Sequence, residues 1–161
     1  MVSPIVMENF LRDLQYVFFR ARKRWPKMRT GFCFALYGYP SRNLILKGMV
    51  GKVRDFKLEK YYELVDEKAK RLFYRGPFHN SSYESREPEA GKYGGAVRGE
   101  HYILSISGMA REHEDEAIAM VTLILHKEMN KLFPRGIAEV TGNKIFDPLY
   151  EDCRREDHSG D

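Results

Sequence analysis

The sequence predicts a single α/β domain of the α+β kind, in which an antiparallel sheet of four or five strands packs against three main helices. Three observations lead to this prediction. Long stretches with apolar residues three and four positions apart indicate helices, and shorter stretches of apolar and β-branched residues indicate strands. Short connectors rich in Gly, Pro and Ser separate neighbouring strands, which favours hairpins and therefore antiparallel pairing.

Composition supports one folded unit. The chain has 161 residues, of which 43% are hydrophobic and 13% aromatic, enough apolar side chains for a core. We expect residues 1–150 to form a single domain. The charge-rich residues 151–161 are expected to form a disordered tail.

Charge and targeting patterns limit the partners and the compartment. A net charge of +4 is a modest basic bias, so nucleic acid is not an expected partner. No stretch approaches about eighteen apolar residues, and no basic region followed by an apolar run opens the chain, so neither membrane insertion nor export is expected. Cys33 and Cys153 lack metal-ligand or redox spacing. We therefore expect a cytoplasmic protein.

Residues 3–24 form the first predicted helix. Ser3 can cap its start, and Pro4 suits the first helical position. Four cations crowd residues 20–24, and we interpret them as complementing the helix dipole rather than as a phosphate or nucleic-acid patch. The apolar face that should pack on the domain consists of Val6, Phe10, Leu11, Leu14, Val17, Phe18 and Ala21.

A hairpin and a second helix follow. Residues 31–37 and 43–50 alternate like strands, and the turn-forming residues 38–42 join them. Asp55 can cap a helix that extends to about residue 74. Its expected buried face consists of Leu58, Tyr61, Tyr62, Val65, Ala69, Leu72 and Phe73.

Residues 92–129 contain the densest set of signals, namely two short strands, a tight turn and a helix. The polar connector at residues 98–101 separates a strand at Val97 from a strand at residues 102–107. Gly108 allows a sharp exit into the helix. The start of that helix is marked by carboxylates that face the positive end of its dipole, namely Glu112, Glu114, Asp115 and Glu116.

Two stretches outside these elements have weaker patterns. Residues 75–91 lack periodicity, so they are expected to form either a lid over a pocket or a disordered connector. Residues 137–140 form a short apolar piece that is consistent with one extra strand.

The chain resembles the small haem-binding, profilin-like family often labelled GlcG/HbpS. The resemblance rests on Gly94-Gly95 before a strand pair, on Ile106-Ser107-Gly108 at a strand end, and on the acidic helix start at residues 114–117. The order of helix, hairpin, helix, linker, strand pair and helix also agrees. The resemblance implies a profilin-like fold, haem or a related cofactor as ligand, and assembly into homo-oligomers.

Candidate site residues follow from these patterns. Hydroxyl groups on one strand face beside a helix start gather hydrogen-bond donors that suit a carboxylate or phosphate, so the expected ligand-binding residues are Gly94, Gly95, Ser105, Ser107 and Gly108. If the ligand is haem, His79 and His101 are candidate axial ligands.

Catalytic and metal sites are not expected. No metal-ligand spacing, nucleophile elbow, P-loop or dinucleotide fingerprint occurs. His113 and Glu116 are spaced as two metal ligands could be, but the acidic helix start already explains the carboxylate.

Two functions from different classes remain. The first is a non-catalytic small-molecule-binding domain, with haem as the leading ligand. The alternative is a structural or protein-interaction module that assembles through its sheet or helix surface. The aromatic residues Tyr16 and Phe19 lie beside the apolar face of the first helix and predict a homo-oligomer contact. A hydrolase or isomerase comes third.

Overall fold

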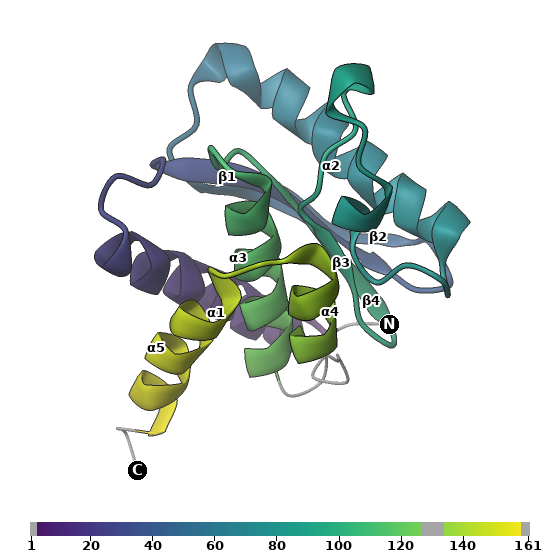
Figure 1. Cartoon of the computed structure of the whole chain (residues 1–161). Coiled ribbons are helices and arrows are strands. Elements are labelled where there is room, and N and C mark those ends of the chain that lie inside the picture. The colour runs from purple at the N-terminus through teal and green to yellow at the C-terminus, as the bar shows by residue number, and fades with distance from the viewer. Residues whose placement is uncertain (1–2, 127–133, 159–161) are drawn as a thin grey trace.

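The computed structural model describes residues 3–126 and 134–158 (Figure 1). It confirms an α+β fold with a four-stranded antiparallel sheet, and it contains five α-helices where the sequence predicts three main ones. In chain order the elements are α1 (Pro4–Arg24), β1 (Gly31–Gly38), β2 (Leu44–Gly51), α2 (Asp55–Arg75), the short 3-10 helices η1 (Ser82–Ser85) and η2 (Pro88–Ala90), β3 (Ala96–Arg98), β4 (Tyr102–Ser107), α3 (Glu112–Leu125), α4 (Pro134–Thr141) and α5 (Phe146–His158).

The sheet joins two hairpins through their inner strands. Its strand order is β2-β1-β4-β3, and every neighbouring pair is antiparallel. In the central pair, Phe34 lies opposite Ile106 and Cys33 lies opposite Ser107. The carboxyl end of β4 therefore lies beside the amino end of β1, at the end of the sheet from which the chain continues into α3.

Helices cover both faces of the sheet. α1 and α3 lie on one face with α5 packed against them, while α2 lies along the other face (Figure 1). β1 is buried on both sides because its alternate residues enter different clusters. Phe32, Phe34 and Leu36 pack toward α1 and α3, whereas Cys33 and Ala35 pack toward α2.

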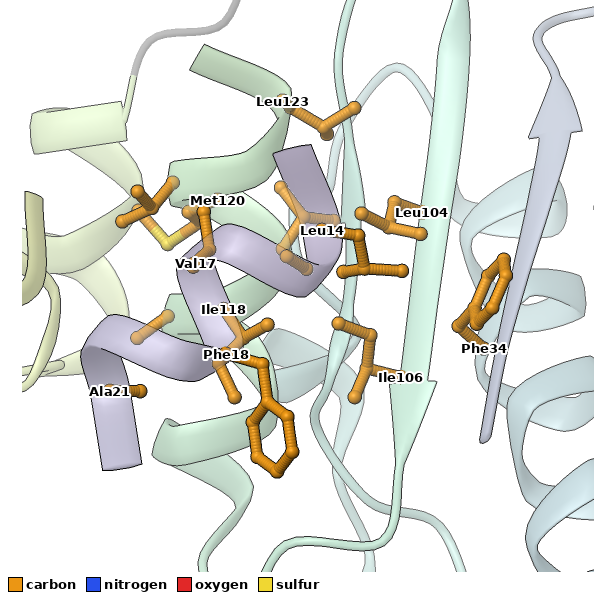
Figure 2. Packing of buried hydrophobic residues seen from close by; sticks show 14 of the residues in the cluster. Leu14, Val17, Phe18, Ala21, Phe34, Leu104, Ile106, Ile118, Met120 and Leu123 are labelled. Atoms are coloured by element: carbon orange, nitrogen blue, oxygen red, sulfur yellow. The ribbon is translucent and has the colours of Figure 1, made fainter. Parts of the chain in front are cut away.

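The largest cluster lies between the sheet and the layer of α1 and α3. Leu14, Val17 and Phe18 of α1 gather beside Ile118 of α3 (Figure 2). Ile106 of β4 completes the contact from the sheet side. The apolar face predicted for the first helix is therefore the face that the fold buries.

Helix boundaries mostly follow local signals. The Ser3 hydroxyl caps α1 by accepting a hydrogen bond from the amide of Val6 at 3.2 Å. Asp55 was predicted to cap α2, but the cap position is Arg54, and Asp55 lies in the first turn, where its charge complements the helix dipole.

The last part of the chain differs from the prediction. Residues 137–140, expected as an extra strand, belong to α4, whose Ile137 is buried in the main cluster. Residues 151–158, expected in a disordered tail, continue α5. Leu149 and Cys153, four positions apart, are buried against the core, and Asp152 pairs with Arg24 of α1 at 2.6 Å. Burial of one helical face thus orders a segment whose composition alone suggested disorder.

The part of the chain that the structure describes contains no helix with both the length and the apolar character needed to span a membrane.

The packing generates a stability prediction for α1. Leu14→Ala should lower the free energy of unfolding by about 2–5 kcal/mol, because Leu14 is fully buried and truncation leaves a cavity. Ile5→Ala on the same helix is the matched control, since Ile5 is 69% exposed and its truncation should cost less than about 0.5 kcal/mol. Urea unfolding followed by circular dichroism measures both. Equal losses for the two variants would contradict the assigned orientation of α1.

Candidate functional site

A cavity of about 740 Å³ lies between α2 and the junction of β4 with α3, and we call it the α2–α3 cavity. Side chains of α2 form one side, and the chain from Ser107 into the first turn of α3 forms the other. Tyr83 and Tyr93, from the segment that precedes β3, also line it. Its lining combines aromatic rings with several charged groups, as small-molecule sites commonly do.

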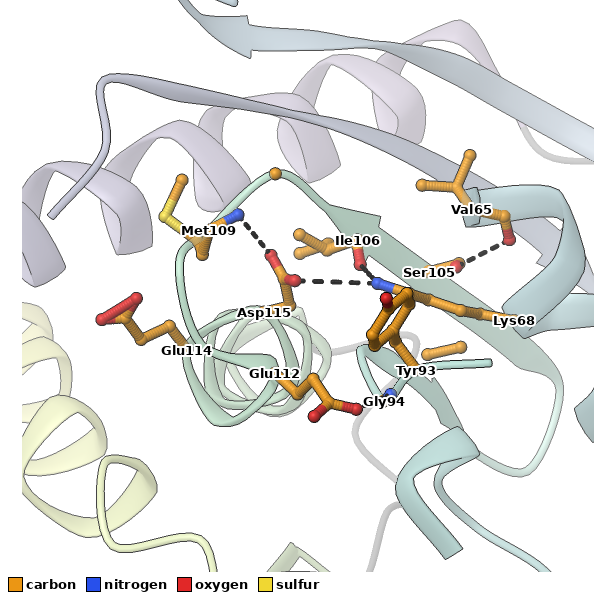
Figure 3. A network of polar contacts seen from close by, with 12 residues as sticks. Val65, Lys68, Tyr93, Gly94, Ser105, Ile106, Met109, Glu112, Glu114 and Asp115 are labelled. Carbon is orange, nitrogen blue, oxygen red and sulfur yellow. Dashed lines mark hydrogen bonds and ion pairs between the residues drawn. The ribbon is translucent and has the colours of Figure 1, made fainter. Parts of the chain in front are cut away.

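A buried ion pair lies at the base of the cavity (Figure 3). Lys68 of α2 is only 1% exposed, and its Nζ donates a hydrogen bond to the carbonyl oxygen of Ile106 at 2.7 Å. The same nitrogen lies 3.6 Å from Asp115 Oδ2, while Asp115 Oδ1 accepts the amide of Met109 at 3.1 Å. The pair therefore connects α2, β4 and α3 at one point.

Gly95 makes room for this pair. Its φ of +131° is strained for any residue with a side chain, and a Cβ there would lie 2.5 Å from the Ile106 oxygen and 2.7 Å from Lys68 Nζ. The glycine that the sequence predicts as a ligand contact thus lies against the buried pair.

Burial shifts the titration of both members of the pair. Desolvation raises the pKa of Asp115 to about 7, although the neighbouring Lys68 opposes the shift. Desolvation also lowers the pKa of Lys68, and here Asp115 acts in the opposite direction. The carboxyl group can therefore gain or lose a proton near neutral pH inside the cavity.

Residues 75–91, expected to form a lid or a disordered connector, lead into an ordered wall of the cavity. Arg71 of α2 holds this segment: its Nη1 donates to the Ser82 carbonyl at 2.9 Å and to the Ser85 hydroxyl at 2.8 Å. Its Nη2 donates to the carbonyl of Tyr93. Tyr83 and Tyr93 are thereby fixed opposite α2.

Positive charge dominates the mouth of the cavity. Arg29, Lys60 and Arg111 line it and are exposed. Of the two acids in the lining, Asp115 pairs with Lys68, and Glu112 pairs with Arg86 at 3.0 Å and accepts the amide of Gly94. The exposed cations are thus left without a matching acid in the lining, which favours an anionic ligand.

The five predicted ligand-binding residues have different roles. Ser107 and Gly108 line the cavity. Ser105 is fully buried and its hydroxyl donates to the Val65 carbonyl at 2.8 Å, so it anchors α2 to the sheet. Gly94 and Gly95 pack behind the lining, where a Cβ on Gly94 would lie 2.8 Å from the ring of Tyr83. Two of the five predicted residues therefore line the cavity, and the other three pack behind it.

The predicted haem ligands do not line this cavity. His79 follows α2, and His101 lies on the exposed turn between β3 and β4. The histidine in the lining is His113, whose Nε2 lies 2.9 Å from the Thr141 carbonyl oxygen and whose ring centroid lies 4.6 Å from that of Tyr83.

The pairing of His113 with Glu116 as metal ligands finds no support within residues 3–126 and 134–158, where no cluster of three metal-binding side chains occurs. Glu116 is fully buried and accepts hydrogen bonds from Ser81, from Thr141 at 2.6 Å and from Asn143 at 2.9 Å. Its carboxylate is thus used to connect α3 with α4 and with the residues before η1.

Sequence reasoning missed Lys68. The only signal for it is its position in the buried stripe of α2, between Val65 and Leu72, where a charged residue is out of place.

Comparison of the chain with protein-family models, with curated proteins and with solved structures finds no match. The resemblance to the haem-binding family therefore stays a prediction.

The buried pair generates a prediction about pH. Between the ordinary pKa of an aspartate, about 4, and the folded value, the folded protein keeps a proton on Asp115 that the unfolded chain has released. This contribution to stability is complete at low pH and is lost as the pH rises through about 7. Relative to Asp115→Asn, the free energy of unfolding of the wild type should fall by on the order of 4 kcal/mol across this window.

Urea unfolding at a series of pH values measures this difference. The lowered pKa of Lys68 affects the free energy of unfolding with the opposite sign. Its contribution to stability is complete at high pH and is lost as the pH falls through the pKa of Lys68 in the folded protein. Asp66→Asn is the control, since Asp66 pairs with Lys47 at 2.7 Å but is half-exposed. A wild-type profile parallel to that of Asp115→Asn would show that burial does not shift the carboxyl group.

Proposed function

We propose that this chain is a non-catalytic binding domain for a small anionic molecule with a flat apolar part, and that the α2–α3 cavity is its site. The observation that carries the proposal is the combination of one cavity, exposed cations at its mouth and fixed aromatic walls. Tyr83 and Tyr93 contribute aromatic side chains to the lining, and Arg29 and Lys60 contribute positive charge. The Lys68–Asp115 pair adds a polar base beneath them.

Haem belongs to this class of ligand because it is a flat aromatic dianion, and the resemblance found in the sequence supports it as the first molecule to try. A haem in the α2–α3 cavity would lie beside the aromatic side chains of the lining and direct its propionates at the exposed cations. Since His79 and His101 do not line the cavity, replacing either by Ala should leave such binding intact. Loss of a haemin Soret shift in either variant would instead locate the haem elsewhere.

Filling the cavity tests the proposal directly. Leu64 lines the cavity from α2, and Leu64→Trp should weaken binding of haemin and of anilinonaphthalene sulfonate by about tenfold or more, because the larger ring occupies the ligand's space. Lys70→Trp, on the exposed side of the same helix, is the control and should bind as the wild type does. Absorbance and fluorescence titrations measure the affinities, and thermal unfolding confirms that both variants fold. Equal binding by both variants would reject the cavity as the site.

The alternative, a module that assembles with copies of itself, is favoured by the exposed apolar residues of α1. Phe19 is 62% exposed and Ile5 is 69% exposed, although both are apolar. Apolar groups outside a monomer's core often mark interfaces, and a symmetric dimer is the commonest closed assembly. Such a dimer is compatible with ligand binding, since neither residue lines the α2–α3 cavity.

Sedimentation equilibrium at micromolar concentration tests this alternative. We expect a mass above that of one 18.9 kDa chain, and Phe19→Glu should lower it because a charge would be buried in the contact. Lys23→Glu, an exposed charge change on the same helix, should leave the mass unchanged. A monomer at every accessible concentration would exclude self-assembly.

A further inference from the structure

A second hollow adjoins the α2–α3 cavity, and its lining is strongly basic. It has a volume of about 460 Å³ and lies where the chain enters β1 and where it passes from β2 into α2. We call it the basic hollow. It shares Arg29, Lys57, Tyr61 and Gly108 with the α2–α3 cavity, so the two spaces meet along these residues.

Charge in the basic hollow has one sign. Its lining contains five cations, Lys27, Arg29, Lys52, Arg54 and Lys57, and no acid. Within the described part of the chain, none of the five forms an ion pair with a carboxylate. Like charges held close together repel, and an anion with several charges would relieve that repulsion. The start of α2 also lies here, where the positive end of its dipole is already complemented by Asp55 in the first turn.

Arg29 is held in place at the junction of the two spaces. Its Nη1 donates to the Tyr61 hydroxyl at 3.3 Å and to the Gly108 carbonyl at 3.2 Å. These bonds orient the guanidinium group and leave its Nη2 without a hydrogen bond inside the described chain. An oriented guanidinium edge suits the paired oxygens of a phosphate better than a mobile lysine does.

The neighbouring α2–α3 cavity offers a different chemistry. Its lining includes four aromatic side chains, Phe56, Tyr61, Tyr83 and Tyr93, together with the buried Lys68–Asp115 pair. A ligand that fits both spaces must therefore combine an aromatic group at one end with several negative charges at the other. The α2–α3 cavity is closed at its inner end by the buried Lys68–Asp115 pair. The arrangement therefore favours a small ligand whose aromatic group ends there over a nucleic-acid strand that continues through the site.

We propose that the ligand is a nucleoside polyphosphate, with its base in the α2–α3 cavity and its phosphates in the basic hollow. This inference rests on the proposed function and names the ligand class for the same site. Arg29 and Lys57, at the junction, would contact the phosphate nearest the sugar, and Lys52 and Arg54 the outer phosphates.

Calorimetric titration with three probes tests the inference: adenosine triphosphate, adenosine, and inorganic tripolyphosphate. The wild type should bind adenosine triphosphate at least about tenfold more tightly than either part, because one molecule then occupies both spaces. Replacing Lys52 and Arg54 together by Glu should weaken the nucleotide and tripolyphosphate by at least about tenfold and leave adenosine unchanged. Leu64→Trp should reduce the nucleotide to the affinity of tripolyphosphate.

A charge-matched control is available. Lys23→Glu combined with Lys70→Glu changes the net charge equally at exposed positions outside both spaces, and should weaken nucleotide binding by less than about threefold. An affinity for adenosine triphosphate no greater than that for tripolyphosphate would overturn the inference and leave only a basic surface. Displacement of the nucleotide by a single-stranded oligonucleotide at lower concentration would also overturn it. If haemin binds in a Leu64-dependent way and the nucleotide does not, the proposed function stands and this inference fails.

Discussion

The buried ammonium group of Lys68 is the interaction on which the arrangement around the cavity depends. Removing a charge from water costs several kcal/mol, so Lys68 can stay inside only while the Ile106 carbonyl and the Asp115 carboxyl group remain in reach. That requirement fixes α2 relative to β4 and α3, the three elements that enclose the site. It also accounts for Gly95, because a Cβ there would clash with the Ile106 carbonyl oxygen and with the lysine nitrogen. The Lys68–Asp115 pair thus fixes the relative positions of α2, β4 and α3, whether or not it contacts a ligand.

Asp115 and Glu116, consecutive in the sequence, connect α3 to different parts of the fold. Asp115 faces the cavity and α2, whereas Glu116 connects α3 with Ser81 and with Asn143 beyond α4. Glu116 has three hydrogen-bond donors around it, which is how a buried carboxylate is tolerated. In the sequence these acids look like the ordinary start of a helix. In the fold they connect α3 with α2, with the residues before η1 and with the residues around the end of α4.

Local patterns in the sequence were sufficient for the elements up to α3, but not for α4 and α5 or for the site. Periodicity predicted α1, α2 and both hairpins because their buried faces are nearly continuous in sequence. The helix at residues 146–158 was missed since its anchors, Leu149 and Cys153, are few and stand among charges. Ser107 and Gly108, predicted from the sequence as ligand-binding residues, line the α2–α3 cavity, and their role in binding stays a prediction. Lys68 and the five cations of the basic hollow come together only through tertiary packing, which no local window contains.

Arg71 gives the site a further property. α2 forms one side of the cavity and holds the opposite wall through Arg71, while Glu112 of α3 holds the same wall through Arg86 and the Gly94 amide. The width of the site is then fixed before any ligand arrives. A ligand would lose translational and rotational entropy on binding, but the protein would not have to become ordered. The entropic cost of association on the protein's side would therefore be small. If the cavity binds a ligand as proposed, shape then contributes to selectivity beside charge, because a molecule slightly too thick for the gap would be excluded instead of being accommodated.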